Sequence, residues 1–318
     1  MRAVVFDGQL RLDAAYPEPN AKPGWARIRV STVGICKTDM EITRGYSGFR
    51  GVLGHEFVGV VDPCEDRALL GKRVVGEINA ACGTCDWCRR ELGRHCPHRT
   101  TLGIVNHDGC MADYCLLPTA NLIPVPAAIG NDRAVLVEPL AAACEILEQV
   151  RLTGSERAVI LGDGRLGILC AWVLSTALDD VTLVGHHPEK LAVAVWRKIK
   201  TAAQIDAVAP QPDLVVEATG SALGIRQALA ICRPRGTVVL KTTVAAGEPL
   251  NLAPLVVNEL TIIGSRCGQF RDALRVMTEF PDMPLERLIA GRYPLRDALA
   301  GFAHAARPGV LKVLLDIG

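Results

Sequence analysis

The chain has 318 residues, a length that suits about two domains of ordinary size. Hydrophobic residues make up 49% and charged residues 22% of it, which is typical of a globular protein with a large core and excludes intrinsic disorder. The net charge is +1 and aromatic residues make up only 4%, so the composition gives no sign of a nucleic-acid surface and argues against a base-stacking platform.

The first third of the chain carries the pattern of short strands. Apolar and polar side chains alternate over residues 26–33, and glycine, proline and charged residues bound the other apolar runs. The predicted strands are 3–6, 10–12, 26–33, 57–61, 72–75, 111–117 and 122–125. Many short strands separated by turns indicate a barrel-like β domain.

The pattern changes near residue 126. A helical stretch over 132–150 is interrupted by Pro139, and strands then alternate with helices. The predicted strands are 158–161, 181–184, 214–217, 237–240, 260–263 and 310–317. The predicted helices are 165–178, 189–198, 270–280, 295–305 and one from the capping Ser221 to Ile231. The alternation of strand and helix predicts an α/β fold with a doubly wound parallel sheet.

The strongest local motif is a group of four closely spaced cysteines, Cys82, Cys85, Cys88 and Cys96. Four thiolates within fifteen residues can occupy the corners of a tetrahedron around Zn²⁺. Such a site has no open position, so it contributes to folding rather than to chemistry. The alternatives are four free surface cysteines or an iron–sulfur cluster, and the spacing is not the usual run of iron–sulfur proteins.

A second set of metal-ligating residue types is spread along the chain. Cys36 follows the strand over 26–33, His55 and Glu56 precede the strand over 57–61, and Glu138 lies in the helical stretch. A thiolate, an imidazole and a carboxylate suit Zn²⁺ with one position open to substrate. Because these residues are remote in sequence, no spacing establishes the site. Taken alone, Cys36 is more often a core cysteine.

A glycine motif follows the first strand of the α/β region. In the segment GDGRLG, Gly162 permits a tight turn, Gly164 lets a pyrophosphate approach, and Gly167 permits close packing of helix on strand. The helix N-terminus at Arg165 and Leu166 attracts the pyrophosphate. The flanking strand and helix favour dinucleotide binding over a glycine turn without a ligand.

The segments GICKTD, GHEFVGVV and VEPLA, with the four cysteines between the second and third, resemble the zinc-dependent medium-chain alcohol dehydrogenases. The resemblance is strongest to the polyol, threonine and glucose dehydrogenase branch. It implies a GroES-like β-barrel catalytic domain over 1–128 and 265–318, with a structural zinc lobe at about 80–98, and an inserted Rossmann domain over 129–264. It also implies that the nucleotide domain is shortened between residues 198 and 213.

The resemblance further implies roles for individual residues. Cys36 and His55, with Glu56 or Glu138, would hold the catalytic zinc, and Asp39 would support His55. The implied catalytic residues are Glu56 and Thr38, whose hydroxyl would contact the substrate alcohol and begin a proton relay. The alternative for Thr38 is a cap of the short helix after Cys36. The residues implied to contact the nicotinamide half and pyrophosphate of the cofactor are Thr219, Gly220, Ser265 and Arg266.

The residues at the end of the predicted strand over 181–184 indicate which nicotinamide cofactor is used. NAD enzymes usually carry an acidic residue there, and this chain has Gly185. His186, His187 and Lys190 offer donors and positive charge that suit a 2′-phosphate. NADP is therefore favoured over NAD, although Glu189 could point back towards the ribose.

The predicted function is reversible hydride transfer between a small polyol, sugar or amino alcohol and NAD(P), with two zinc ions per chain. The alternatives are a zinc-independent reductase of the same superfamily and a non-catalytic zinc- or nucleotide-binding paralogue. No secretion signal precedes the first strand, so a cytoplasmic location is expected. A homo-oligomer, either a dimer or a tetramer, is expected, with no nucleic acid or membrane partner.

Overall fold

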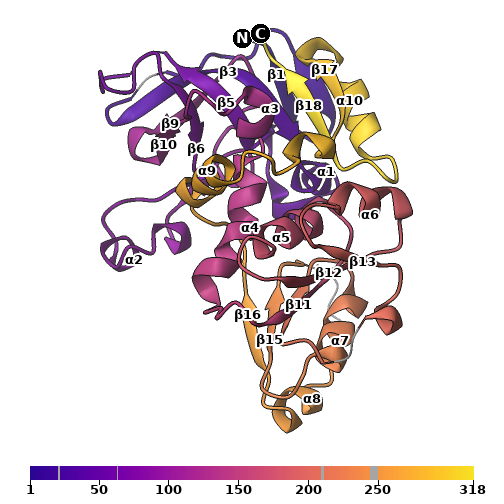
Figure 1. Ribbon diagram of the computed structural model, residues 1–318. Helices are drawn as coiled ribbons and strands as arrows, with labels where there is room; N and C mark the ends of the chain where they lie inside the picture. The colour runs from indigo at the N-terminus through magenta and orange to yellow at the C-terminus, as the bar shows by residue number, and fades with distance from the viewer. Residues whose placement is uncertain (21, 63, 209–210, 244–249) are drawn as a thin grey trace. The chain divides into compact units, whose positions relative to one another are not determined.

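The computed structural model describes residues 1–20, 22–62, 64–208, 211–243 and 250–318. The chain forms two compact units (Figure 1). Unit 1 consists of Met1–Glu138, Ala273–Pro281 and Ile289–Gly318. Unit 2 consists of Pro139–Asp272 and Asp282–Leu288.

Unit 1 is built on a sheet in the order β10-β6-β5-β3-β18-β17, with β9 also paired to β3. The strands are β3 (Trp25–Ile35), β5 (Glu56–Val61), β6 (Arg73–Gly76), β9 (Tyr114–Pro118), β10 (Leu122–Pro124), β17 (Ile289–Pro294) and β18 (Lys312–Asp316). β3 is long enough to pair with β5, β9 and β18, so segments from both ends of the chain share one sheet. Buried side chains such as Ile28, Val33 and Val58 form its core.

Smaller elements complete unit 1. A second sheet has the order β2-β1-β4, and a two-stranded ribbon carries the cysteine segment. The strands are β1 (Ala3–Phe6), β2 (Leu10–Asp13), β4 (Gly51–Val52), β7 (Asn79–Ala80) and β8 (Thr100–Thr101). The helices are α1 (Lys37–Ile42), α2 (Asp86–Arg89), α3 (Asn131–Ala134) and α10 (Ala298–Ala305). Two helices cross the boundary of the units, α4 (Val137–Gln149) and α9 (Phe270–Glu279).

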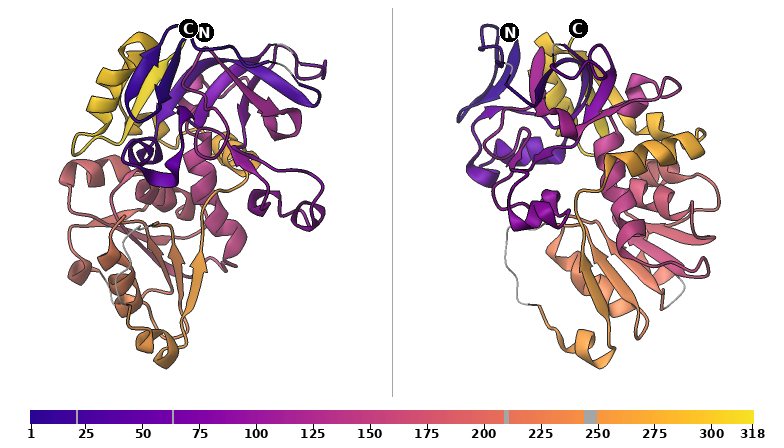
Figure 2. Two further views of the ribbon diagram at one scale, coloured as in Figure 1. Left: turned by 180° about the vertical axis from the view of Figure 1, so that it is seen from behind. Right: turned by 90° about the vertical axis from the view of Figure 1, so that its left-hand side faces the viewer.

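Unit 2 is a parallel sheet in the order β13-β12-β11-β14-β15-β16. The strands are β11 (Arg157–Leu161), β12 (Asp180–Val184), β13 (Lys200–Ala202), β14 (Leu214–Glu217), β15 (Thr237–Leu240) and β16 (Thr261–Gly264). The helices are α5 (Arg165–Leu174), α6 (Pro188–Ala194), α7 (Ala222–Ile231) and α8 (Ala253–Val257). Figure 2 shows helices on both faces of this sheet. The strand order is that of a dinucleotide-binding fold, which confirms the predicted fold class.

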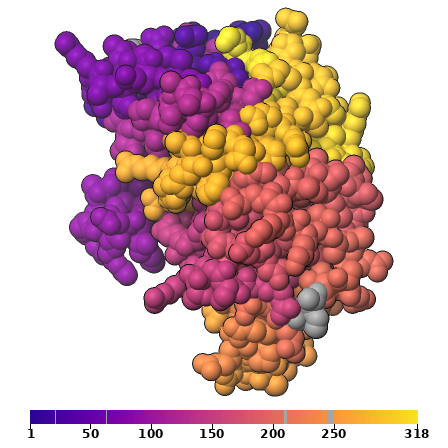
Figure 3. Space-filling view, in the orientation of Figure 1, coloured from indigo at the N-terminus to yellow at the C-terminus, as the bar shows by residue number. Residues whose placement is uncertain are grey.

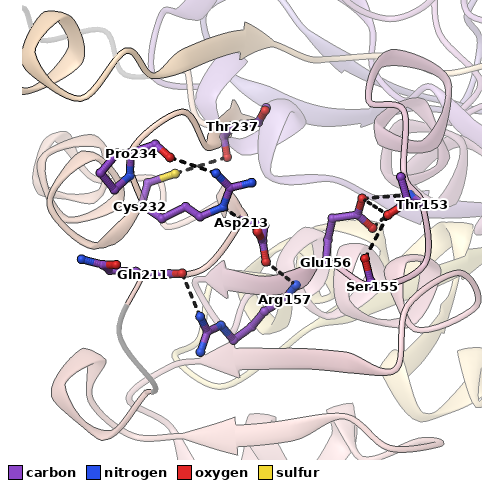
Figure 4. Close-up of polar contacts among 10 residues, drawn as sticks. Thr153, Ser155, Glu156, Arg157, Gln211, Asp213, Cys232, Pro234 and Thr237 are labelled. Atoms are coloured by element: carbon purple, nitrogen blue, oxygen red, sulfur yellow. Dashed lines mark hydrogen bonds and ion pairs between the residues drawn. The ribbon is translucent and has the colours of Figure 1, made fainter.

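Polar residues fasten the amino ends of the strands in unit 2, away from the edge where such sheets bind ligands. The Asp213 carboxylate accepts from the Arg157 backbone N–H at 2.8 Å and from the Arg233 side chain at 2.5 Å. Glu156 accepts from the Thr153 backbone N–H and hydroxyl (Figure 4). These contacts hold the loops before β11 and β14 without occupying the carboxyl edge.

Several predicted boundaries were wrong. The break in the helical stretch falls between α3 and α4, and Pro139 lies inside the first turn of α4, where no N–H is required. Two predicted helices end early, at Leu174 and Ala194. Strand β17 was not predicted. Between β13 and β14 the described residues hold only a 3₁₀ turn, Ile205–Ala207, where a full helix would lengthen the domain.

Candidate active site

The four cysteines of unit 1 converge. Cys82 follows β7, Cys85 is the N-cap of α2, Cys88 lies within that helix, and Cys96 follows a 3₁₀ turn. Gly83 has φ of +75°, a left-handed conformation that lets the chain turn between the first two sulfurs. The short spacings therefore fold into tight turns, with one helical turn separating Cys85 from Cys88.

The sulfur separations match a tetrahedral zinc site. Four Sγ–Sγ distances lie between 3.5 and 3.9 Å. A tetrahedron with zinc–sulfur bonds of about 2.3 Å has edges of about 3.8 Å. Backbone N–H groups of Thr84 and Cys85 lower the pKa of Cys82 to about 5, whereas desolvation raises the pKa of Cys88 to about 11. Four cysteine sulfurs at these distances fit a zinc ion, which binds cysteines as thiolates.

A second cluster is buried in the same unit. Ligand atoms of Cys36, His55 and Glu56 all lie within 4.8 Å of one another. Cys36 directly follows β3 and is the N-cap of α1, His55 directly precedes β5, and Glu56 begins β5. The paired strands β3 and β5 therefore bring the three side chains together. All three are buried. A thiolate, an imidazole and a carboxylate form a donor set that fits Zn²⁺.

Asp39 contacts the residues of this cluster. Its carboxylate is wholly buried and accepts from the backbone N–H groups of Cys36 at 2.8 Å and Gly54 at 3.2 Å. Its Oδ1 lies 3.3 Å from His55 Nδ1, close enough for an ion pair but not aligned as a hydrogen bond. Burial opposes a charge on His55, yet Asp39 and Cys36 raise its pKa well above the ordinary value. The cluster is thus rich in negative charge and suits a cation.

The glycine motif of unit 2 has the geometry that its sequence predicts. Gly162 has φ of +112°, and a Cβ there would meet the backbone of Ala218 at 2.6 Å. A Cβ at Gly167 would overlap the carbonyl of Gly162. Gly164 is the N-cap of α5, so the first backbone N–H groups of the helix, including Arg165 and Leu166, face the turn. This turn fits the pyrophosphate of a dinucleotide.

Comparison with known proteins agrees with this arrangement. The alcohol dehydrogenase GroES-like domain matches residues 22–127, and the glucose dehydrogenase C-terminus matches residues 131–317. The chain is 30% identical to an L-threonine 3-dehydrogenase of Streptomyces avermitilis, over 94% of each chain. It is 28% identical to a D-altritol 5-dehydrogenase of Agrobacterium fabrum, also over 94% of each chain. An alcohol dehydrogenase from Thermus sp. ATN1 shares its fold, with 29% identity, a TM-score of 0.90 and 100% of both chains covered.

The chain belongs to the zinc-dependent medium-chain alcohol dehydrogenase family. It is therefore an oxidoreductase that transfers a hydride between an alcohol and NAD(P). In the part of the chain that the structure describes, no helix combines the length and the hydropathy needed to cross a membrane.

Other predicted site residues of this alcohol dehydrogenase lie as follows. Glu138 is in the first turn of α4 and is not in the cluster of Cys36, His55 and Glu56. Thr38 is half-buried in the first turn of α1. The N-cap of that helix is Cys36, so the alternative that Thr38 caps it was wrong.

The predicted cofactor segments lie at the carboxyl ends of strands. Thr219 and Gly220 follow β14, and the Thr219 hydroxyl donates to Glu217 at 2.6 Å. Ser265 and Arg266 follow β16. Ser265 is buried and lies 2.8 Å from Lys241 Nζ, which also donates to the carbonyls of Ala142 and Arg266. Burial lowers the pKa of Lys241.

Three charged residues near the predicted sites were not predicted from the sequence. Lys312 is wholly buried and forms an ion pair with Glu56, while donating to the Ile35 carbonyl at 3.0 Å. Lys241 anchors the segment after β16. Asp163, inside the glycine motif, binds the residues after β12. A single lysine in the apolar strand VLKVLLDIG was a usable signal, whereas nothing in the sequence marked the partners of Asp163.

A polar cavity of about 530 Å³ also lies in unit 1. Phe49, Arg50, Asn106 and Asp108 are among its lining residues. Asp108 is held in place by the Tyr16 hydroxyl, which donates to it at 2.8 Å. The described ligands of the two metal clusters are not in its lining.

Proposed function

We propose that this enzyme oxidises a small polyol, sugar or amino alcohol at a catalytic zinc held by Cys36, His55 and Glu56. The buried cluster of these three side chains is the observation that carries the proposal. The four cysteines would hold a second, structural zinc, which gives two zinc ions per chain. The named substrates of two relatives, L-threonine and D-altritol, support a hydroxylated and polar substrate.

The residues in and around the cluster would have different roles in the reaction. Zinc, when bound, acts as a Lewis acid that polarises the substrate oxygen and makes its hydroxyl more acidic. Cys36 and His55 would hold it, and Asp39 fixes the loop of Cys36 and the ring of His55. Thr38 is two residues from Cys36, and its hydroxyl would receive the proton of the substrate hydroxyl while passing its own proton outward, as the first member of a relay. Lys312 holds the Glu56 carboxylate, and Glu138 is the alternative carboxylate ligand.

The nicotinamide cofactor would lie over the glycine turn, with Thr219, Gly220, Ser265 and Arg266 towards its nicotinamide half. The preference for NADP that the sequence predicts would depend on His186, His187 and Lys190 after β12. His186 is exposed, and its Nδ1 lies 3.2 Å from the Ala203 carbonyl. The Asp163 carboxylate beside His187 and Lys190 opposes that preference, because it offsets their positive charge.

A zinc assay and a substrate panel test the proposal together. We expect the purified enzyme to contain two zinc ions per chain and to reduce NAD or NADP with at least one polyol, sugar or amino alcohol. Cys36→Ser should lower kcat/KM at least about 100-fold while the melting temperature changes little, since an open site adds little to the core. Cys170→Ser, at a buried cysteine of α5, is the matched control.

The outcomes separate the alternatives. A zinc-independent reductase would keep full activity in Cys36→Ser, and a non-catalytic paralogue would bind zinc and cofactor without turning over any substrate of the panel. Normal activity of Cys36→Ser would overturn the assignment of the zinc cluster.

We also propose a homo-oligomer in a reducing compartment such as the cytoplasm. The twelve cysteines are all free of disulfides, which suits a reducing environment. In unit 2, α8 exposes Val256 and Val257 by 74% and 79%. This helix lies in the orange region at the bottom of Figure 3. Exposed apolar side chains of this size favour contact with a second copy.

A further inference from the structure

Gly185 and Asp163 compete for one place at the carboxyl edge of unit 2. Gly185 directly follows β12, where an NAD enzyme usually carries its acidic residue. A Cβ built on Gly185 would overlap the Asp163 side chain, and its three nearest atoms all belong to that residue. The strand end therefore has a carboxylate beside it, supplied by the glycine turn rather than by the strand.

The surroundings of Asp163 keep this carboxylate charged. It accepts from the His187 backbone N–H at 2.8 Å and lies 2.9 Å from His187 Nδ1, while Lys190 Nζ is 3.8 Å away. Burial alone raises the pKa of Asp163, but the contacts with His187 and Lys190 lower it below the ordinary value. At neutral pH the group carries a full negative charge.

The same contacts offset the positive charge of Lys190 and engage the ring of His187. Lys190 is largely buried against Asp163, and the His187 ring is turned onto the carboxylate while its side chain stays 45% exposed. Taken together, Asp163 and Lys190 contribute no net charge. A 2′-phosphate needs donors whose positive charge is not already paired with a carboxylate, whereas a ribose hydroxyl needs only a hydrogen-bond partner.

We propose that Asp163 is a specificity-determining residue, which replaces the missing strand-end carboxylate and favours the ribose 2′-hydroxyl of NAD over the 2′-phosphate of NADP. The inference rests on the proposed function of this unit as the nicotinamide cofactor site. It assigns cofactor choice to a residue inside the glycine motif and not to position 185. It also counters the preference for NADP that His186, His187 and Lys190 suggest by sequence.

Binding of cofactor fragments tests this without zinc or hydride transfer. The probes are ADP-ribose and 2′-phospho-ADP-ribose, titrated by calorimetry into the full-length wild type and into Asp163→Asn. We expect the ratio of affinities to move towards the phosphorylated probe by about 10- to 100-fold, the usual range for a hydrogen bond to a charged group. Asp180→Asn, at an exposed carboxylate at the other end of β12, is the control and should leave the ratio unchanged.

A relocated carboxylate guards against a variant that merely distorts the turn. Asp163→Gly combined with Gly185→Asp moves the acid to the strand end after removing the side chain that blocks it. We expect this double variant to recover the wild-type ratio within about threefold, and Gly185→Asp alone to melt at a lower temperature. Circular dichroism checks the fold of each variant.

Each outcome supports or overturns the proposal. A ratio that is unchanged in Asp163→Asn, or that moves towards ADP-ribose, would show that Asp163 only positions His187 and Lys190 for a phosphate. Failure of the wild type to bind either probe would overturn the cofactor site itself. An enzyme that shows the expected shift but oxidises no alcohol would overturn the proposed reaction and leave the inference about Asp163 standing.

Discussion

The pair of Lys312 and Glu56 shows how one buried charge depends on another. Both side chains are wholly buried, and the lysine also donates to the Ile35 carbonyl. Gly34 makes room for them, because a Cβ there would lie 3.2 Å from Lys312 Nζ and would overlap the Glu56 carboxylate. Removing one partner of such a pair leaves an uncompensated charge in a medium of low dielectric. Lys312 thus links β18 to the cluster of Cys36, His55 and Glu56.

We expect Lys312→Met to reduce the free energy of unfolding by about 3–5 kcal/mol, because the buried Glu56 carboxylate loses the ammonium group with which it pairs. The double variant Lys312→Met with Glu56→Gln should lose less than Lys312→Met alone. Urea denaturation of wild type, both single variants and the double variant measures the coupling. Strictly additive losses would contradict a direct dependence of Glu56 on Lys312.

At the scale of elements, the segment that carries the four cysteines has little core of its own. α2 is four residues long and contains no buried residue, and the two-stranded ribbon of β7 and β8 contributes two residues from each strand. Short elements of this kind are not stable without a cross-link or a metal. We infer that the sulfur cluster, rather than apolar packing, holds the segment together.

Cys85→Ser should therefore act on stability rather than on chemistry. We expect one zinc ion fewer per chain and a loss of about 3 kcal/mol, part of what a structural zinc contributes. For a protein of this size that loss lowers the melting temperature by roughly 4–5 °C. Zinc content and thermal unfolding check it, with Cys64→Ser, at a cysteine outside both clusters, as the control. An unchanged melting temperature together with a lost zinc ion would contradict the structural role.

Some of the helices and strands could be predicted from the sequence and others could not. Apolar runs predicted β11, β12, β14 and β15 to within a residue or two, because strands buried on both faces are apolar throughout. β17 was missed because its sequence, IAGRYP, neither alternates nor forms an apolar run. The glycine turn and the cysteine cluster followed from local spacing. The partners of Asp163 and Lys312 could not be predicted, because the ion pairs join residues 24 and 256 positions apart.

At the scale of the molecule, the parallel sheet of unit 2 ends, among the described residues, in an edge strand. Among the described residues, β16 is the last strand of the parallel sheet, and α8 precedes it with exposed valines. An open strand edge beside apolar side chains invites pairing with another copy. The expected homo-oligomer has a specific candidate surface here, which the sequence alone did not identify.

We expect Val256→Glu combined with Val257→Glu to shift the enzyme towards the monomer, because two charges would be buried in the contact. Light scattering coupled to size-exclusion chromatography measures the mass. Leu299→Glu, at an apolar side chain of α10 that is 48% exposed, is the control and should leave the mass unchanged. A double variant with the wild-type mass would place the contact elsewhere.

The overlap between positions 163 and 185 also restricts how such an enzyme can evolve. A mutation that introduces aspartate at residue 185 first would force two carboxylates into one volume, so that order of events is closed. In the other order of mutations, Asp163 is replaced first, and the intermediate protein has no acidic residue at the end of β12. Such an intermediate would tolerate either cofactor, so a change of coenzyme in this lineage would begin with a loss of discrimination.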